Sequence, residues 1–215
     1  MTDRVVSQLP SGGELRLTRP GSRHVVVCVN GGQAREVEGT WSSTIEWLVG
    51  RLAPRFPTLG FAEVRYRVKS WRALDLCVQD ASEAIEAAGG ARTLLVGFSM
   101  GGAVAVGASG DRSVEGVVGL APWLYDRLEF TPLLGKRLDV LHGSLDRWLP
   151  GIPGVSPELS RRGFDRAQAA GIEGTYTMVP GGVHGTALRA PWGGLVALPR
   201  ARRWQQLLEQ RLKLF

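Results

Sequence analysis

Six short apolar runs, separated by stretches of helical periodicity, constrain the fold of this chain more than any other feature of its sequence. The runs are rich in β-branched residues and almost continuous in hydrophobicity, which is typical of strands covered on both faces. We expect strands at residues 23–29, 60–66, 92–98, 114–120, 137–143 and 174–180. An earlier run at residues 14–18 could add an antiparallel edge strand.

Amphipathic stretches fill the intervals between these runs. We expect helices at residues 40–53, 71–89, 101–108 and 156–171, and a fifth within 200–215. In the second stretch, apolar residues recur at helical spacing: Leu74, Cys77, Val78, Ala81 and Ile85. The last stretch carries one apolar stripe, which predicts a helix docked on the body rather than on a membrane surface: Trp204, Leu207, Leu208 and Leu212. The alternation predicts an α/β protein with a mostly parallel central sheet and helices on both faces.

The size and composition of the chain fit one globular unit. Because 44% of its 215 residues are apolar and only 21% are charged, we expect residues 1–215 to form a single domain.

No run approaches the roughly 20 apolar residues that span a bilayer, and the first residues lack the apolar block of a secretion signal. We therefore expect a soluble, cytoplasmic protein. Cys28 and Cys77 fall on apolar faces, where inert thiols of a reducing compartment are expected.

The net charge of +6 and the isoelectric point near 10.0 raise the question of an acidic partner. Arginine supplies most of the positive charge, but it is dispersed along the chain and no nucleic-acid motif accompanies it. The longest local groups are residues 160–162 and 200–203. We expect solvated surface charge, with neither a nucleic-acid nor a membrane partner. Arg67 and Lys69, just after the 60–66 strand, could instead bind an anionic substrate.

The segment "GFSMGG", residues 97–102, joins a predicted strand directly to a predicted helix. A corner with almost no loop forces its central residue into an unfavourable backbone conformation, and crowding requires small flanking residues. Gly97 and Gly101 meet that requirement around Ser99, and the pattern GxSxG in this setting is a nucleophile elbow. A glycine-rich turn can also serve close packing alone, and the segment lacks the spacing and the lysine of a phosphate-binding loop.

A serine hydroxyl needs a base to take its proton, and the chain offers three histidines. His24 opens the first central strand, at the end of the sheet away from Ser99, and a structural role is expected. His142 ends the 137–143 strand, where it could pack or orient another residue. His184 follows the last strand on a glycine-rich loop that can reach over the sheet. We expect His184 to be the base.

The base in turn needs an acid to hold its tautomer. Asp146 lies just past the strand that ends near His142, and Asp126, after the preceding strand, is the rival. We favour Asp146, because the order Ser99, Asp146, His184 is the order of an α/β-hydrolase. A surface cap or a salt bridge is the alternative role for either aspartate.

The attacked carbonyl needs N–H donors for its developing negative charge. The amide of Met100, directly after the nucleophile, is the first candidate. The second donor is expected from "VCVNGGQ", after the first central strand, where Gly31 and Gly32 allow close backbone approach to a bound substrate. We favour Gly32, with Gln33 second. An ordinary tight turn would also explain these glycines.

Together these segments resemble the α/β-hydrolase superfamily over nearly the whole chain, and more narrowly its small capless members akin to the dienelactone-hydrolase group. The resemblance rests on "NGGQA", "RYRVKSW", "GFSMGG", "GLAPWL", "LHGSLDR" and "PGGVHG". It implies a serine hydrolase that acts on a small-molecule ester or thioester through an acyl-enzyme, with no metal or organic cofactor. An acyltransferase or cyclase with the same acyl-enzyme, and a noncatalytic ligand-binding module, are the alternatives.

Two positions depart from these relatives. Asn30-Gly31 stands where many carry His-Gly, and Ser99 stands where dienelactone hydrolases use cysteine. The substrate of dienelactone hydrolases is therefore not assigned to this chain.

Many relatives also insert a lid after the strand that ends here at Leu120, but residues 121–136 are too few for an independent lid. We therefore expect an open site.

Three tryptophans follow segments that end at the reactive edge of the sheet: Trp71, Trp123 and Trp148. They could form apolar walls for an acyl or aromatic group, and core packing is the alternative for each.

Overall fold

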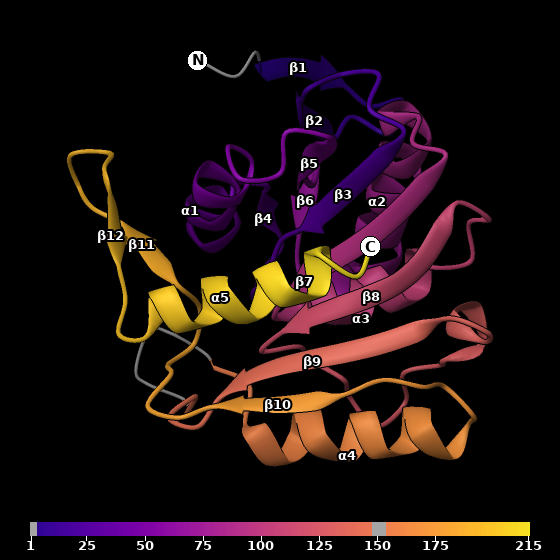
Figure 1. Ribbon diagram of the computed structural model, residues 1–215, viewed down its shortest axis with the longest axis vertical. Coiled ribbons are helices and arrows are strands. Elements are labelled where there is room, and N and C mark those ends of the chain that lie inside the picture. Colours follow the sequence, from indigo (N-terminus) through magenta and orange to yellow (C-terminus); the bar gives the residue numbers. More distant parts are fainter. Residues whose placement is uncertain (1–3, 148–153) are drawn as a thin grey trace.

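The computed structural model describes residues 4–147 and 154–215, and its centre is an eight-stranded sheet (Figure 1). The strands run in the order β1-β2-β5-β3-β7-β8-β9-β10. From β5 to β10 all neighbours are parallel, whereas β1 and β2 are antiparallel. Their bounds are β1 Arg4–Gln8, β2 Glu14–Thr18, β3 His24–Val29, β5 Leu59–Arg65, β7 Arg92–Phe98, β8 Val114–Leu120, β9 Arg137–Gly143 and β10 Tyr176–Val179. The mostly parallel sheet that the sequence predicts is confirmed.

Helices cover both faces of the sheet. Two of them, α1 (Ser43–Leu52) and α5 (Ala201–Leu212), pack with one face of the sheet in one buried apolar cluster. The others, α2 (Leu74–Ala88), α3 (Met100–Ala108) and α4 (Pro157–Ala169), pack in a second cluster. In Figure 1, α5 crosses in front of the sheet. Its apolar stripe is buried as the sequence predicts, at Trp204, Leu207, Leu208 and Leu212.

Local sequence signals begin and end these helices. The hydroxyl of Ser42 accepts the N–H of Ile45 at 3.3 Å at the start of α1, and Ser156 accepts the N–H of Leu159 at 3.1 Å at the start of α4. Such caps satisfy backbone donors that a helix leaves free. Helix α2 ends at Gly89, whose φ of 64° favours glycine. Of these caps, Ser156 also lines the cavity beside Ser99 described below.

Some strands, and the true edge of the sheet, are not predicted by the sequence pattern. Strand β2 is antiparallel as expected, but β1 pairs outside it and is the real edge. All five residues of β1 are exposed, so it lacks the apolar pattern that would have predicted it. Two small pairs were also missed, β4 (Val37–Glu38) with β6 (Val68–Lys69) and β11 (Ala187–Arg189) with β12 (Leu195–Ala197).

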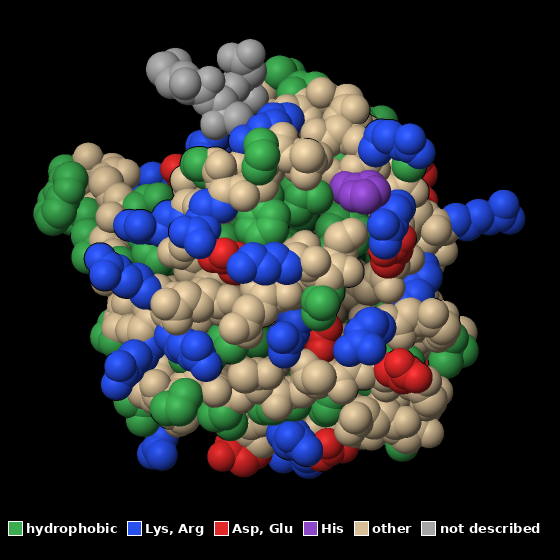
Figure 2. Space-filling view, in the orientation of Figure 1, with side chains coloured by type: hydrophobic (Ala, Val, Ile, Leu, Met, Phe, Trp, Pro, Cys, Tyr) green, Lys and Arg blue, Asp and Glu red, His purple; other side chains and the backbone are tan. Residues whose placement is uncertain are grey.

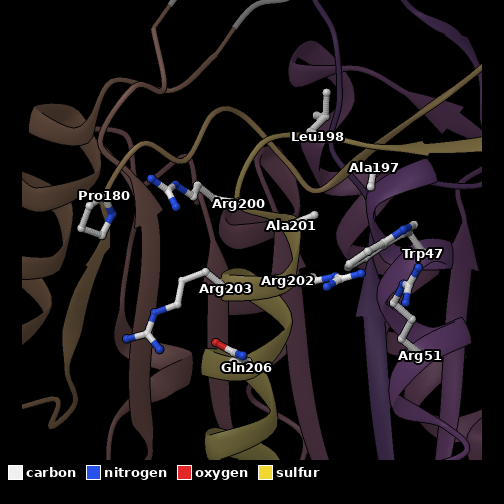
Figure 3. A pocket seen from close by; sticks show the side chains of 10 residues that line it. All are labelled: Trp47, Arg51, Pro180, Ala197, Leu198, Arg200, Ala201, Arg202, Arg203 and Gln206. Carbon is white, nitrogen blue, oxygen red and sulfur yellow. The ribbon is translucent and has the colours of Figure 1, made fainter.

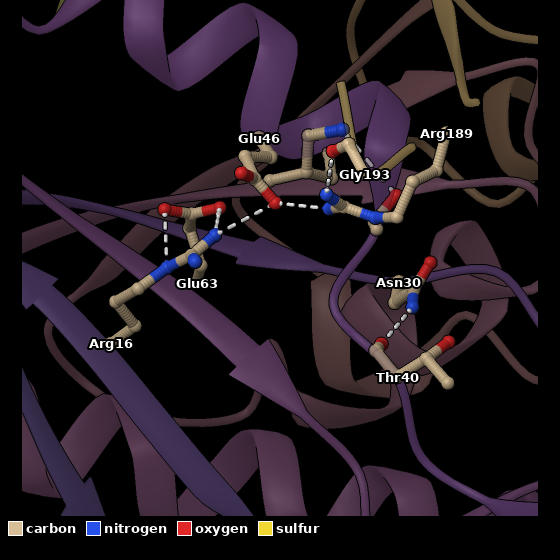
Figure 4. Close-up of polar contacts among 9 residues, drawn as sticks. Arg16, Asn30, Thr40, Glu46, Glu63, Arg189 and Gly193 are labelled. Atoms are coloured by element: carbon tan, nitrogen blue, oxygen red, sulfur yellow. Dashed lines mark hydrogen bonds and ion pairs between the residues drawn. The ribbon is translucent and has the colours of Figure 1, made fainter. Parts of the chain in front are cut away.

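A chain of ion pairs joins the antiparallel strands to α1 and β11 (Figure 4). Arg16 on β2 donates two hydrogen bonds, of 3.0 and 2.6 Å, to the buried carboxylate of Glu63 on β5. Arg16 also lies 3.4 Å from Glu46 on α1, which accepts a 2.6 Å bond from Arg189 on β11. Burial raises the pKa of Glu63, although the hydrogen bonds from Arg16 oppose this. These ion pairs tie the β11–β12 pair to α1 and the central sheet.

Four expectations about the lid, membrane spans, surface charge and cysteines can be compared with the structure. Between β8 and β9, residues 121–136 form only one short 3-10 turn, Thr131–Leu133, so that segment contains no lid. None of the described helices is long and apolar enough to cross a bilayer. Lysine and arginine side chains are scattered over the face seen in Figure 2. Both cysteines are buried, and burial raises the pKa of Cys77 to about 11.

Candidate active site

The backbone at Ser99 is strained in the way that a sharp strand-to-helix corner requires. Its φ of 57° and ψ of −121° lie in a region that residues other than glycine rarely adopt. A Cβ at Gly97 would overlap the carbonyl of Gly101, and one at Gly101 would meet the carbonyls of Val29 and Asn30. The crowding around the corner therefore explains both glycines of the motif.

Backbone hydrogen bonds hold this corner in place. The N–H of Ser99 donates to the carbonyl of Leu120 at 3.0 Å. The carbonyl of Ser99 accepts the N–H groups of Gly102 at 2.9 Å and Trp123 at 2.8 Å. Because β8 and its following loop supply two of these partners, the Ser99 side chain is fixed at the carboxyl end of the sheet, where it is 8% exposed.

His184 and Asp146 meet at the same edge of the sheet. Nδ1 of His184 lies 2.8 Å from Oδ2 of Asp146, and the His184 ring packs 4.9 Å from the ring of Phe98, the residue before Ser99. The bond to Asp146 leaves Nε2 of His184 for proton transfer. No hydrogen bond joins Ser99 to His184 within the described residues, and such bonds often tighten only when substrate binds.

Asp126 takes no part in this arrangement. Its side chain is exposed, and its backbone carbonyl accepts a hydrogen bond from Arg166. The structure therefore pairs the histidine with Asp146 rather than with the rival aspartate.

Asp146 is fully buried, and three nitrogen atoms lie against its carboxylate. In addition to His184, Val155 donates its N–H to Oδ1 at 3.2 Å, and Nε2 of His142 lies 3.2 Å from Oδ2. Burial alone would raise the pKa of Asp146, but the hydrogen bonds from His142 and His184 outweigh it and lower the pKa. The carboxylate is thus kept ionised in a buried position.

The loop after β3 is anchored by Asn30, the residue that departs from the His-Gly of relatives. Its Oδ1 accepts the N–H of Gly31 at 2.7 Å. Its Nδ2 donates to the carbonyl of Thr40 at 2.7 Å (Figure 4). Its own carbonyl accepts the hydroxyl of Tyr66 at 3.0 Å. Because the N–H of Gly31 is engaged, an oxyanion donor from this loop must come from a later residue.

The backbone of that loop lies against the start of α3. A Cβ at Gly32 would overlap the sulfur of Met100, and a Cβ at Gly31 would lie 3.2 Å from Cβ of Ser99. The carbonyl of Gln33 accepts the N–H of Trp71 at 3.0 Å. The two segments expected to supply oxyanion donors are therefore adjacent, and Met100 begins α3, where the helix dipole favours negative charge.

A cavity of about 320 Å³ opens beside Ser99. Its lining consists of Ser99, Trp71, Trp123, Gly154, Val155, Ser156 and Leu159. The rings of Trp71 and Trp123 lie 6.1 Å apart, so two of the three expected tryptophans meet at the site. The third, Trp148, lies outside the described residues.

Residues 154–159 contribute a wall of the cavity that the sequence motifs do not predict. The signal that could have found it is the proline- and glycine-rich stretch at residues 149–157, which leads into α4.

A larger hollow, of about 740 Å³, lies between α1, β12 and α5. It is lined by Trp47 and four arginines, but by none of Ser99, Asp146 and His184. Figure 3 shows Arg200 and Arg203 directed away from Arg51 and Arg202, so the four guanidinium groups do not converge on one point. This hollow therefore provides no alternative to the cavity at Ser99.

Arg67, Lys69 and His24, the other polar residues considered from the sequence, do not line the cavity at Ser99. Arg67 donates to Gln79 at 2.5 Å and lies 3.5 Å from Asp80, and Lys69 donates to Thr40 at 2.8 Å; neither lines the cavity. The ring of His24 packs 5.6 Å from that of Phe215. Within residues 4–147 and 154–215, no group of three or more histidine, cysteine, aspartate or glutamate side chains is arranged to hold a metal ion.

The sheet order, the helices on both faces and the strained serine corner define the α/β-hydrolase fold, as solved structures bear out. A serine hydrolase homologue from Coxiella burnetii is 17% identical with a TM-score of 0.68, covering 99% of this chain and 98% of that one. A dienelactone hydrolase-like promiscuous phosphotriesterase from metagenomic libraries is 18% identical, with a TM-score of 0.66 and coverage of 99% and 96%. A thermophilic esterase from Thermogutta terrifontis is 17% identical, with a TM-score of 0.66 and coverage of 99% and 91%. The sequence matches no family model and no curated protein.

Proposed function

We propose that the protein is a serine hydrolase that cleaves a carboxylic ester or thioester through an acyl-enzyme. The observation that carries the proposal is the strained Ser99 beside a cavity, at the sheet edge where His184 is bonded to Asp146. A buried carboxylate that fixes the Nδ1–H tautomer of a histidine is what a serine nucleophile needs from its partners. The similar solved structures include proteins described as a serine hydrolase homologue and an esterase, which is consistent with this class.

The chemistry would proceed in two half-reactions. Oγ of Ser99 attacks the substrate carbonyl while Nε2 of His184 takes the hydroxyl proton, and Asp146 stabilises the imidazolium. The tetrahedral oxyanion accepts hydrogen bonds from the N–H groups of Met100 and Gly32, with Gln33 as the further candidate. His184 then protonates the departing alcohol or thiol. Water attacks the acyl-enzyme with His184 again as base, and the carboxylic acid leaves.

The cavity favours an uncharged acyl group. Its described lining contains two tryptophans, a leucine and a valine, and no charged side chain. Its volume of about 320 Å³ lies at the small end of the range for ligand sites, roughly 300 to 1,000 Å³. A short aliphatic or a single-ring acyl group fits these walls, whereas an anionic tail would find Arg67 and Lys69 engaged elsewhere.

A fluorophosphonate probe tests the proposal. We expect stoichiometric labelling of Ser99, abolished in Ser99→Ala and retained in Ser109→Ala, whose serine is buried at the far end of α3. Labelling should be accompanied by hydrolysis of short p-nitrophenyl esters or acyl-thioesters. Folded protein that is not labelled would contradict the proposal and favour a noncatalytic binding module.

Product analysis separates hydrolysis from acyl transfer. With added alcohols or amines, a hydrolase yields mainly the free acid, whereas an acyltransferase yields mainly the new ester or amide.

A further inference from the structure

A second histidine lies against Asp146, and the proposed chemistry does not use it. His142 is the penultimate residue of β9 and is fully buried. Its Nε2 lies 3.2 Å from Oδ2 of Asp146 and 3.0 Å from the carbonyl of Val155. Its ring stacks on that of Tyr176, with the ring centres 6.2 Å apart and the planes 8° from parallel.

These contacts assign the tautomer of the ring. The carboxylate oxygen and the carbonyl oxygen both accept hydrogen bonds, so Nε2 of His142 must carry the proton and share it between them. Nδ1 is buried and has no hydrogen-bond partner among the described residues. A proton on Nδ1 would therefore be an unsatisfied buried donor, which disfavours that tautomer.

Resting on the proposed function, we infer that His142 is a positioning residue that acts through Asp146. Oδ2 of Asp146 accepts from His184 and lies 3.2 Å from Nε2 of His142, and Oδ1 accepts from Val155. The N–H of His142 on this side holds the orientation of the carboxylate, so that its oxygen faces Nδ1 of His184. Its complete burial leaves His142 no path to substrate, whereas the side chain of His184 is 11% exposed.

His142 also connects the acid to the wall of the cavity. It bonds to the carbonyl of Val155, and Asp146 bonds to the N–H of the same residue. Val155 lines the cavity at Ser99. Two hydrogen bonds and the 3.2 Å contact between His142 and Asp146 therefore form a closed ring that links strand β9, the acid and the substrate wall.

The test compares side chains that keep or lose the donor at the position of Nε2. Glutamine can place an amide N–H near that position, leucine has no donor, and the shorter asparagine does not reach it. The protein contains only three histidines, so ¹⁵N-histidine NMR can resolve the His184 Nδ1–H signal in each variant. This readout does not require turnover. Calorimetry shows which variants are folded, and p-nitrophenyl butyrate gives kcat and KM.

In His142→Leu we expect the hydrogen-bonded His184 signal to broaden or be lost, and kcat to fall roughly 10- to 100-fold with KM changed less than about threefold. We expect His142→Gln to retain the signal and most of kcat. If His142→Leu does not fold, His142→Asn should show the loss that His142→Gln does not.

Two results would overturn the inference. One is a folded His142→Leu protein with the wild-type His184 signal and kcat. The other is glutamine as damaging as leucine or asparagine, which would indicate packing alone. A wild-type protein with an intact His184 signal but no probe labelling would instead contradict the hydrolase proposal and leave the role of His142 standing.

Discussion

His184 and Asp146 are hydrogen bonded at 2.8 Å although they lie 38 positions apart in the chain. The sheet explains this meeting, because β9 and β10 are parallel neighbours and their following loops bond to each other. Leu145 donates its N–H to the carbonyl of Gly182 at 2.8 Å, and Gly181 donates to the hydroxyl of Ser144 at 2.9 Å. The pairing of acid and base is therefore a consequence of strand register.

Replacing Asp146 should lower activity far more than replacing Asp126. Asp146→Asn removes the charge that stabilises the His184 imidazolium, and we expect kcat to fall about 10⁴-fold. Asp126→Asn alters an exposed side chain and should leave kcat within about twofold of the wild type. Steady-state hydrolysis of a p-nitrophenyl ester measures both, and the reverse ranking would reassign the acid.

Filling the space at Gly32 should disturb the oxyanion donors. An added Cβ would overlap the Met100 sulfur, so Gly32→Ala should separate the two backbone segments and lower kcat roughly 10²- to 10³-fold. Gly50→Ala is the matched control. Its Cβ meets nothing within 4 Å on helix α1, and it should raise stability by about 0.5 to 1 kcal/mol with kcat unchanged. Equal activity in the two variants would remove the oxyanion role from this loop.

Opening the cavity should change the preferred acyl length. Trp71→Ala removes one wall, and the ratio of kcat/KM for octanoyl over butyryl esters should rise roughly tenfold. Trp192→Ala, in the turn between β11 and β12, removes a tryptophan that is 79% exposed and lies outside the cavity lining, and should leave the ratio unchanged. An unchanged ratio in Trp71→Ala would place the acyl group elsewhere.

The buried pair of Arg16 and Glu63 should matter for stability rather than for activity. Glu63 is only 2% exposed, and Arg16→Met leaves its carboxylate without a partner. We therefore expect the unfolding free energy to fall by about 3 to 5 kcal/mol. Arg16→Met/Glu63→Leu should recover much of that loss.

The pH dependence of this loss follows from the raised pKa of Glu63. The folded state binds that proton more readily than the unfolded state, so the loss in Arg16→Met should shrink as the pH falls from 7 to 5. Urea unfolding at both pH values measures it. A loss that grows at the lower pH would contradict the account.

The elements that bury continuous apolar runs could be predicted from the sequence. Strands β7, β8 and β9 occupy the expected residues because burial on both faces leaves a direct hydrophobic signal. Strand β1 and the β11–β12 pair could not be found in this way. Their residues are largely exposed, and their pairing depends on neighbours distant in the chain.

In the candidate site, too, residues marked by a local sequence pattern could be predicted, and contacts that depend on the fold could not. The local glycines predict Ser99 as the nucleophile, and the positions of Asp146 and His184 after strands that end at one edge predict them as its partners. The contacts of Val155 with Asp146 and His142 and the anchoring of the loop by Asn30 join residues 9 to 36 positions apart. The contact of His142 with Asp146 spans only four positions, but it depends on the turn that follows β9. No local pattern encodes such contacts.

The most direct measurement of the central claim is the pre-steady-state release of p-nitrophenol from a short p-nitrophenyl ester, followed by intact-mass and peptide analysis of the quenched protein. For an acyl-enzyme on Ser99 we predict a burst of about one equivalent per chain when deacylation is slower than acylation. We also predict one acyl group on the peptide that contains Ser99, and neither burst nor acyl group in Ser99→Ala; this is the central claim. Turnover by the folded protein with the acyl group on another residue, or undiminished turnover in Ser99→Ala, would contradict it.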